Sequence, residues 1–167
     1  MMPRIISHND VEVPYRRRSV RGIRLFISEN VMNDMIWHSE DGGDVEVMGL
    51  LIGHAYSDEE GRYVTVEKAM TSPLLSDAVS VRFDRESMED LFEGLDRLKE
   101  DEMITGWYHS HPGFGCFLSD MDIKTQTGIF GEGDGFAVVV DPVQKEVSAF
   151  EVSGGMSLTV QFIVMDD

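Results

Sequence analysis

The chain has 167 residues, of which 42% are hydrophobic, so it is long enough to form one domain with a sizeable core. Its formal net charge of -17 argues against a nucleic-acid partner, because phosphate groups would repel it. It contains no apolar run of the roughly 20 residues that span a bilayer, and residues 1–14 show no secretory signal. Cys116 is the single cysteine, which leaves no intrachain disulfide and suits a reducing compartment. We therefore expect a cytoplasmic protein that binds neither nucleic acid nor membrane.

The charge is unevenly distributed along the chain. Residues 1–24 hold six arginines against only two acidic residues, Asp10 and Glu12, whereas the remainder is strongly acidic. The arginine run at 16–18 is either a solvated tail that folds back onto the acidic domain or a docking arm for a larger assembly. We expect a basic N-terminal tail at 1–21 and a single domain at 22–167.

The first predicted elements are a strand and a helix. Gly22–Ile27 has the apolar content of a strand, and the Ser28 side chain is suited to capping the helix that follows. That helix carries one apolar stripe, which consists of Val31, Met32, Met35 and Ile36. Ser39–Asp44 is acidic and contains glycine, which predicts a loop.

A hairpin and a second helix are expected next. Val45–Tyr56 is too apolar for a half-exposed strand, so we expect it to lie centrally in a sheet. A turn at 57–62 leads into a partner strand at Tyr63–Met70. Asp84 then begins a helix with one apolar face, formed by Met88, Leu91, Phe92, Leu95 and Leu98.

The second half of the chain continues this mixture of strands and helices. Met103–His109 is predicted to be a buried strand, and Ser119 begins a helix. Three further strands are expected at 136–140, 147–152 and 158–164, with a hairpin turn at 143–146. Strands and helices in this order indicate an α/β fold with a mixed sheet.

The most informative segment is the run from His109 to Asp122. Residues two apart in an extended chain point to the same side, so His109 and His111 can converge on one metal ion. With Ser119 at the N-cap, Asp122 lies one turn inside the next helix and projects back toward the strand end. Two imidazoles and one carboxylate suit zinc and leave a fourth position for water, as in catalytic zinc sites. An isolated histidine is usually neither ligand nor catalyst, but this combination is more restrictive and predicts a Zn2+ site.

Two further residues can supply chemistry beside such a metal. Glu46 is an acidic residue in a predicted apolar strand, so it is either a rim residue that faces water or a general base. Zinc lowers the pKa of bound water to about 7, so a nearby carboxylate can take its proton and pass it to a leaving amine. The Ser119 hydroxyl could donate to the developing oxyanion while it caps the helix.

Side chains near the motif are candidates for a substrate groove. Phe114 and Phe117 lie in a loop with Gly113 and Gly115, which favours a groove wall over the core. Cys116 is a candidate nucleophile or fourth ligand, but spacing pairs no base with it, and a fourth protein ligand would displace the water. We therefore interpret Cys116 as a packing residue.

Three segments carry a resemblance to a known family. The runs GWYHSHPGFGCFLSDMD at 106–122, VEVMGLLIG at 45–53 and FAVVVDP at 136–142 resemble the motifs of the JAMM (MPN-plus) zinc metalloproteases. They are especially similar to the deubiquitinating subunit of the proteasome lid. The resemblance implies a curved mixed sheet flanked by helices, like the cytidine deaminase architecture. It also implies that Glu46 is the catalytic base, that Ser119 assists the transition state, and that zinc is held by His109, His111 and Asp122.

The same resemblance suggests the reaction and how the substrate is bound. Members of the family cut the isopeptide bond between the C-terminal tail of a ubiquitin-like protein and a lysine amine. Thr71–Phe83 corresponds to a loop that clamps this tail in relatives. Val79, Val81 and Phe83 alternate with polar residues, a pattern that can pair with an extended peptide or form an ordinary sheet strand.

Three hypotheses about function follow. The first is a zinc isopeptidase that acts on conjugates of ubiquitin or a ubiquitin-like protein, with the proteasome, another MPN subunit or a second copy of the chain as candidate partners. The second is a zinc hydrolase of small-molecule amides, which would need a closed pocket instead of a wide groove. The third is a non-catalytic MPN scaffold subunit, which the intact set of candidate catalytic and metal-binding residues argues against.

Overall fold

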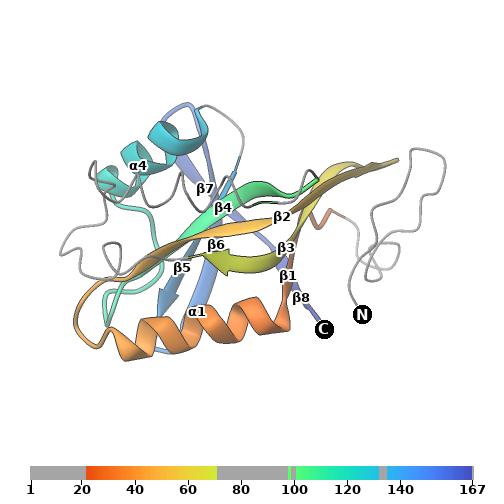
Figure 1. Cartoon of the computed structure of the whole chain (residues 1–167). Helices are drawn as coiled ribbons and strands as arrows, with labels where there is room; N and C mark the ends of the chain where they lie inside the picture. The colour runs from red at the N-terminus through yellow and green to blue at the C-terminus, as the bar shows by residue number, and fades with distance from the viewer. Residues whose placement is uncertain (1–21, 71–97, 99–100, 132–134, 167) are drawn as a thin grey trace.

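The computed structural model describes residues 22–70, 98, 101–131 and 135–166, and Figure 1 shows their arrangement. These residues form one mixed sheet of eight strands together with two helices. The strands are β1 (Leu25–Ser28), β2 (Met48–Asp58), β3 (Gly61–Met70), β4 (Met103–Ser110), β5 (Phe136–Asp141), β6 (Glu146–Ser153), β7 (Met156–Val160) and β8 (Phe162–Met165). The helices are α1 (Glu29–Asp41) and α4 (Asp120–Phe130), and neither is long and apolar enough to cross a bilayer.

The strands lie across the sheet in the order β7-β6-β5-β4-β2-β3-β1-β8. β4 runs parallel to β5, and β1 runs parallel to both β3 and β8, whereas the other neighbours are antiparallel. Gln161 alone separates the two edge strands β7 and β8, so the sheet curls until its edges meet there. The pairing register of β2 shifts at Ile52, an irregularity of the kind that bends strands. The predicted α/β fold with a curved mixed sheet is confirmed.

The two helices lie on opposite faces of the sheet (Figure 1). α1 begins after Ser28, whose Oγ accepts a hydrogen bond from the Val31 N–H at 3.4 Å, as the cap prediction required. One apolar cluster joins α1 to the sheet and includes Leu25, Ile27, Met35, Leu51 and Val138. The second cluster lies on the face covered by α4 and includes Met48, Leu50, Trp107, Ile123 and Val139.

Several boundaries differ from the sequence-based predictions. The segment predicted as a loop from Ser39 stays helical to Asp41, and the buried Ser39 Oγ donates to the Met35 carbonyl at 2.7 Å. β2 begins at Met48, so the three residues before it are not part of the strand. The strand predicted at 158–164 is interrupted at Gln161, because its two halves pair with opposite edges of the curled sheet.

Two predictions fall largely on residues that the structure does not describe. The basic tail at 1–21 and the helix that begins at Asp84 lie outside the described residues. Leu98, at the end of that predicted helix, is described and packs against the second apolar cluster.

Gly106→Ala tests the close approach of β4 and β5. A Cβ at Gly106 would lie 2.2 Å from the Phe136 carbonyl oxygen, so alanine should force the strands apart. We expect the free energy of unfolding to fall by about 3 kcal/mol, near the upper end of the usual cost of overpacking. Gly128→Ala in α4 is the control, because no atom of a neighbouring element lies within 4 Å of its Cβ and alanine favours the helix by up to ~1 kcal/mol. Urea unfolding measures both, and equal stability of the two variants would contradict the strand contact.

Candidate metal centre

Consecutive side chains of β4 point to opposite faces of the sheet. Trp107 and His109 face α4, and their rings stack with centroids 4.5 Å apart and planes 15° apart. Tyr108 faces α1, where its hydroxyl lies 2.6 Å from His38 Nδ1. His109 is therefore fully buried near the carboxyl end of the strand, on the face that α4 covers.

His111 follows the last residue of β4 and returns to the same side as His109. Its backbone N–H donates to the Val140 carbonyl of β5 at 2.9 Å, so extended pairing continues past the end of the strand. The Nε2 atoms of the two imidazoles lie 3.0 Å apart. His111 Nδ1 lies 3.1 Å from the Gly115 carbonyl oxygen. A carbonyl only accepts, so Nδ1 carries a proton, and in the neutral ring Nε2 presents a lone pair.

Asp122 is brought to the histidines by the N-terminus of α4. Ser119 is the N-cap: its Oγ accepts from the Asp122 N–H at 3.1 Å, and its own N–H donates to Asp122 Oδ2 at 2.9 Å. This reciprocal capping box holds the carboxylate in place. Oδ2 also lies 3.1 Å from His109 Nε2 and 3.3 Å from His111 Nε2. Ser119 is partly exposed, and its hydroxyl retains a proton to donate.

The two nitrogens and the oxygen form a triangle with edges of 3.0, 3.1 and 3.3 Å. Tetrahedral zinc with bonds of about 2.0–2.1 Å has ligand–ligand edges of roughly 3.3 Å, so the triangle matches the spacing that this ion requires. All three residues are buried, and within the described residues they are the one such group that could hold a metal ion. The donor set fits zinc, and its role as a ligand set stays a prediction.

The three groups strongly influence one another's ionisation. Burial alone would raise the pKa of Asp122, but its contacts with His109 and His111 hold that pKa well below its usual range. Burial lowers the pKa of His109, although Asp122 opposes this effect. Burial would also lower the pKa of His111, but Asp122, the Gly115 carbonyl and Glu46 together raise it. The site therefore favours an ionised carboxylate beside a neutral His109, which are the forms that bind a metal ion.

Glu46 lies at the edge of this triangle. It stands two positions before the start of β2, so the prediction that it lies within the strand is wrong. Its Oε1 lies 3.9 Å from His111 Nε2, and its side chain is 27% exposed. Burial raises the pKa of Glu46, against the opposing charge of His111. A carboxylate with a raised pKa that reaches both the triangle and solvent is well placed to accept a proton.

Ser110 lies between the two histidines and was not among the residues predicted from the motif. Its Oγ accepts from the Val47 N–H at 2.9 Å, and its own N–H donates to the Val47 carbonyl at 3.0 Å. These bonds tie the residue after Glu46 to the end of β4. The sequence did contain a signal for it. Side chains alternate along a strand, so Ser110 points to the face opposite His109 and His111, and a buried hydroxyl there needs a polar partner.

The loop after His111 contributes apolar surface at the rim of the site. Phe117 is 47% exposed, and its ring centroid lies 4.7 Å from that of His111. Phe114, on the same loop, is 72% exposed. Cys116 points toward β5, with Sγ 3.3 Å from the Val139 carbonyl, and burial raises the pKa of its thiol. The two phenylalanines are therefore accessible to a substrate, whereas Cys116 has the contacts of a packing residue.

The remaining candidate substrate-binding residues cannot be placed in the site. Val79, Val81 and Phe83, with the segment Thr71–Phe83 that contains them, lie outside the described residues.

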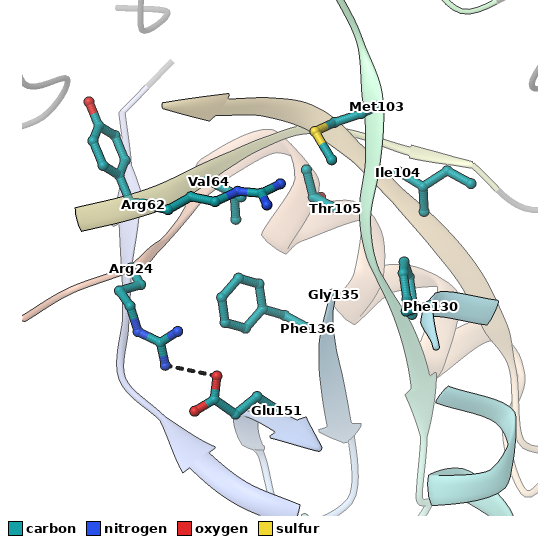
Figure 2. A pocket seen from close by; sticks show the side chains of 11 residues that line it. Arg24, Arg62, Val64, Met103, Ile104, Thr105, Phe130, Gly135, Phe136 and Glu151 are labelled. Carbon is teal, nitrogen blue, oxygen red and sulfur yellow. Dashed lines mark hydrogen bonds and ion pairs between the residues drawn. The ribbon is translucent and has the colours of Figure 1, made fainter. Parts of the chain in front are cut away.

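A separate pocket of about 90 Å³ lies at the other end of the same strands (Figure 2). Residues 103–105 at the start of β4 and 135–136 around the start of β5 line it. Arg24 and Glu151 line it too, and the Arg24 guanidinium donates to Glu151 at 2.8 Å. Extended strands rise about 3.3 Å per residue, which separates this end of β4 from His109 by roughly 13 Å. The pocket is therefore distinct from the candidate metal centre.

Fold and site together place the chain among α/β proteins with the donor set of a metal-dependent hydrolase. The sequence profile of the family described as JAB1/Mov34/MPN/PAD-1 ubiquitin protease matches residues 21–130, a range that includes all five candidate catalytic and metal-binding residues. The chain belongs to this family, which confirms the resemblance seen in its motifs.

Three relatives are similar over most of the chain. COP9 signalosome complex subunit 5 of Kluyveromyces lactis is 37% identical over 145 residues, which are 83% of this chain and 38% of that protein. Ubiquitin carboxyl-terminal hydrolase RPN11 of Saccharomyces cerevisiae is 39% identical over 126 residues, which are 72% of this chain and 39% of that protein. The 26S proteasome non-ATPase regulatory subunit 14 of Caenorhabditis elegans is 40% identical over 126 residues, which are 72% of this chain and 38% of that protein. The chain thus spans well under half the length of these relatives.

A solved structure shows the same fold at low sequence identity. The solution structure of a protein from Desulfitobacterium hafniense matches with a TM-score of 0.65 at 20% identity, over 86% of this chain and 94% of that one.

Asp122→Asn tests the electrostatics of the centre in metal-free protein. Because the folded-state pKa of Asp122 lies below its unfolded value, its charge stabilises the fold above about pH 4, and this contribution is lost as the pH falls further. The variant should lower the free energy of unfolding at pH 7 by about 1.5–3 kcal/mol, the usual contribution of a hydrogen bond to a charged group. Denaturant unfolding should show this deficit shrinking toward pH 3. Asp120→Asn, an exposed change in the same helical turn, is the control. An Asp122→Asn deficit that is independent of pH would contradict the assignment.

Proposed function

We propose that this protein is a zinc-dependent isopeptidase that removes ubiquitin or a ubiquitin-like protein from conjugates. The observation that carries the proposal is the buried triangle of His109, His111 and Asp122, with Glu46 Oε1 3.9 Å from His111 Nε2. Membership of the JAB1/Mov34/MPN/PAD-1 family supports the reaction class. The names of the relatives, which include a ubiquitin carboxyl-terminal hydrolase, support the substrate class.

In this proposal His109, His111 and Asp122 hold the zinc ion. When bound, the ion supplies Lewis-acid chemistry, which polarises the scissile carbonyl and lowers the pKa of the attacking water. Glu46 takes a proton from that water and passes it to the leaving lysine amine, a task that its raised pKa suits. Ser119 donates a hydrogen bond to the developing oxyanion and remains the N-cap of α4.

The surroundings of the site favour a macromolecular substrate over a small amide. Phe117 is exposed beside the His111 ring and Phe114 is exposed on the same loop, where a protein surface could cover them. A hydrolase of small amides would enclose its substrate, whereas these two rings are open to solvent. The exposed rim therefore supports a groove that admits an extended tail.

The remaining parts of the proposal concern the substrate tail and partners. Thr71–Phe83 would clamp the extended tail, with pairing through Val79, Val81 and Phe83. The names of the relatives, which are subunits of the proteasome and the signalosome, support an assembly with the proteasome or another MPN subunit, and a homodimer is the alternative. A single cysteine supports a cytoplasmic location.

Loss of a donor should abolish zinc binding. We expect one zinc ion per chain in the wild-type protein, and we expect His109→Ala and Asp122→Ala to lose it, because two donors no longer form a stable site. His54→Ala is the matched control, since that histidine pairs with Glu67 at a different part of the sheet and should leave the zinc content unchanged. Elemental analysis of the purified proteins measures the metal. Full retention of zinc in both donor variants would refute the ligand assignment.

Glu46→Gln should retain zinc and lose turnover. The amide has the shape of the carboxylate but cannot take a proton, and positioned acid–base groups contribute about 10²–10⁴-fold to the rate. The assay is the cleavage of ubiquitin-like conjugates with and without a chelator, with products identified by mass. Glu59→Gln, an exposed change in the β2–β3 turn, is the control and should cleave at the wild-type rate. A wild-type rate for Glu46→Gln would remove Glu46 from the mechanism, and cleavage that resists the chelator would remove zinc from it.

A further inference from the structure

Asp141, the last residue of β5, is a fully buried carboxylate with no part in the proposed chemistry. Its Oδ1 accepts hydrogen bonds from the N–H groups of Gly113 at 2.9 Å, Val143 at 3.0 Å and Gln144 at 3.0 Å. Its Oδ2 accepts one from the Gly115 N–H at 2.8 Å. Burial would raise the pKa of Asp141, but these four backbone donors lower it. The side chain therefore joins the β5–β6 turn to the loop that follows His111.

The loop is shaped so that its backbone can reach this carboxylate. The Phe114 N–H donates to the His111 carbonyl at 3.1 Å, which closes a turn with Pro112 and Gly113 at its centre. Gly113 and Gly115 have φ values of 82° and 83°, in the region that favours glycine. With proline first and a positive-φ glycine second, this is a type II turn. Both glycine N–H groups consequently meet Asp141.

Gly115 connects Asp141 to the candidate metal centre. Its N–H is bound by Asp141 Oδ2 at 2.8 Å, and its carbonyl accepts from His111 Nδ1 at 3.1 Å. His109 is held differently, by stacking on Trp107, and its Nδ1 has no hydrogen-bond partner within the described part of the chain. The position of the Gly115 carbonyl therefore affects the orientation and tautomer of His111 but not those of His109.

We propose that Asp141 is a positioning residue that holds the Gly115 carbonyl against His111 Nδ1 and so keeps the His111 Nε2 lone pair directed at the metal. The inference rests on the proposed zinc site and extends it to a residue outside the donor set. A group that hydrogen-bonds the second ring nitrogen of a ligating histidine sets the tautomer and orientation of that ring. Asp141 does so through one intervening peptide unit.

Asp141→Asn is a selective test because the two carboxylate oxygens accept different hydrogen bonds: Oδ1 accepts three and Oδ2 accepts only the one from Gly115. An asparagine can place its oxygen where Oδ1 accepts three N–H groups, which puts its NH2 group where Oδ2 faces the Gly115 N–H. Two donors then face each other, and the Gly115 peptide must move. The β5–β6 turn keeps its bonds, whereas the support of His111 is lost.

The first measurement is zinc affinity, by competition with a chelator at fixed pH. Asp141→Asn should bind zinc about 10- to 100-fold more weakly than wild type, the usual effect of removing an outer-shell partner. Val138→Ala is the matched control, because it removes fully buried core volume from the same strand, in the apolar cluster that joins the sheet to α1. It should unfold at a lower temperature yet bind zinc as the wild type does. Equal weakening in both variants would refute a positioning role and indicate general loosening of β5.

The second measurement is the tautomer of the His111 ring in metal-free protein, by ¹⁵N NMR of its imidazole nitrogens at a pH above its raised pKa, where the ring is neutral. The wild type should show a proton fixed on Nδ1, whereas Asp141→Asn should show a mixture of tautomers, with His109 unchanged. An unchanged His111 tautomer together with wild-type zinc affinity would overturn the proposal. Because this readout needs no metal, it tests the role of Asp141 even if zinc binding itself, and with it the proposed function, were to fail.

A glycine variant tests the same connection by a second route. Gly115→Ala strains a backbone with φ of 83° and should also weaken zinc binding and mix the His111 tautomers. Gly154→Ala, at a positive-φ position in the β6–β7 turn, has no atom within 4 Å of its Cβ and should leave both readouts unchanged. Wild-type readouts in Gly115→Ala would contradict the connection through Gly115.

Discussion

One carboxylate oxygen, Oδ2 of Asp122, joins helix α4 to the end of strand β4. It accepts the Ser119 N–H at the start of the helix and lies within 3.3 Å of His109 and His111. Removing a carboxylate from water is costly unless charged or polar partners surround it, and this oxygen has three of them. Because the helix cap and the candidate donor set share one atom, α4 cannot shift along the sheet without changing the geometry of the centre.

The end of strand β4 is fixed in place because its side chains contact several different elements. The Trp107 indole N–H donates to Gln126 of α4, and the Tyr108 hydroxyl meets α1 at His38. Ser110 binds the backbone that leads into β2. Rings and peptides on several sides therefore restrict the imidazoles, which is the rigidity that a precise metal or catalytic site requires.

A second polar network holds the opposite end of β4. His54 Nδ1 pairs with Glu67 of β3, and its Nε2 lies 3.4 Å from Asp101, which precedes β4. Lys68 Nζ lies 2.7 Å from Glu102, the next residue along. These contacts tie the start of β4 to the β2–β3 hairpin, so the strand is anchored by polar contacts at both ends and by apolar packing between them.

Features that depend on residues close in sequence were predictable. The alternation of His109 and His111, the Ser119 cap with Asp122 one turn inside the helix, and the Ser28 cap all follow from one strand period or one helical turn. Features that depend on distant residues were not. Gln161 divides a predicted strand because the sheet closes on itself, and Ser110 reaches Val47 across 63 positions of sequence.

The sequence by itself therefore determined the kinds of donor, their local spacing and the helix that presents Asp122. Only the tertiary structure decided that Glu46 stands outside β2 yet beside His111, and that Asp141 gathers four backbone N–H groups from two loops. The physical reason is that backbone donors have no sequence signature of their own, and their positions follow from the register in which the strands of the curled sheet pair.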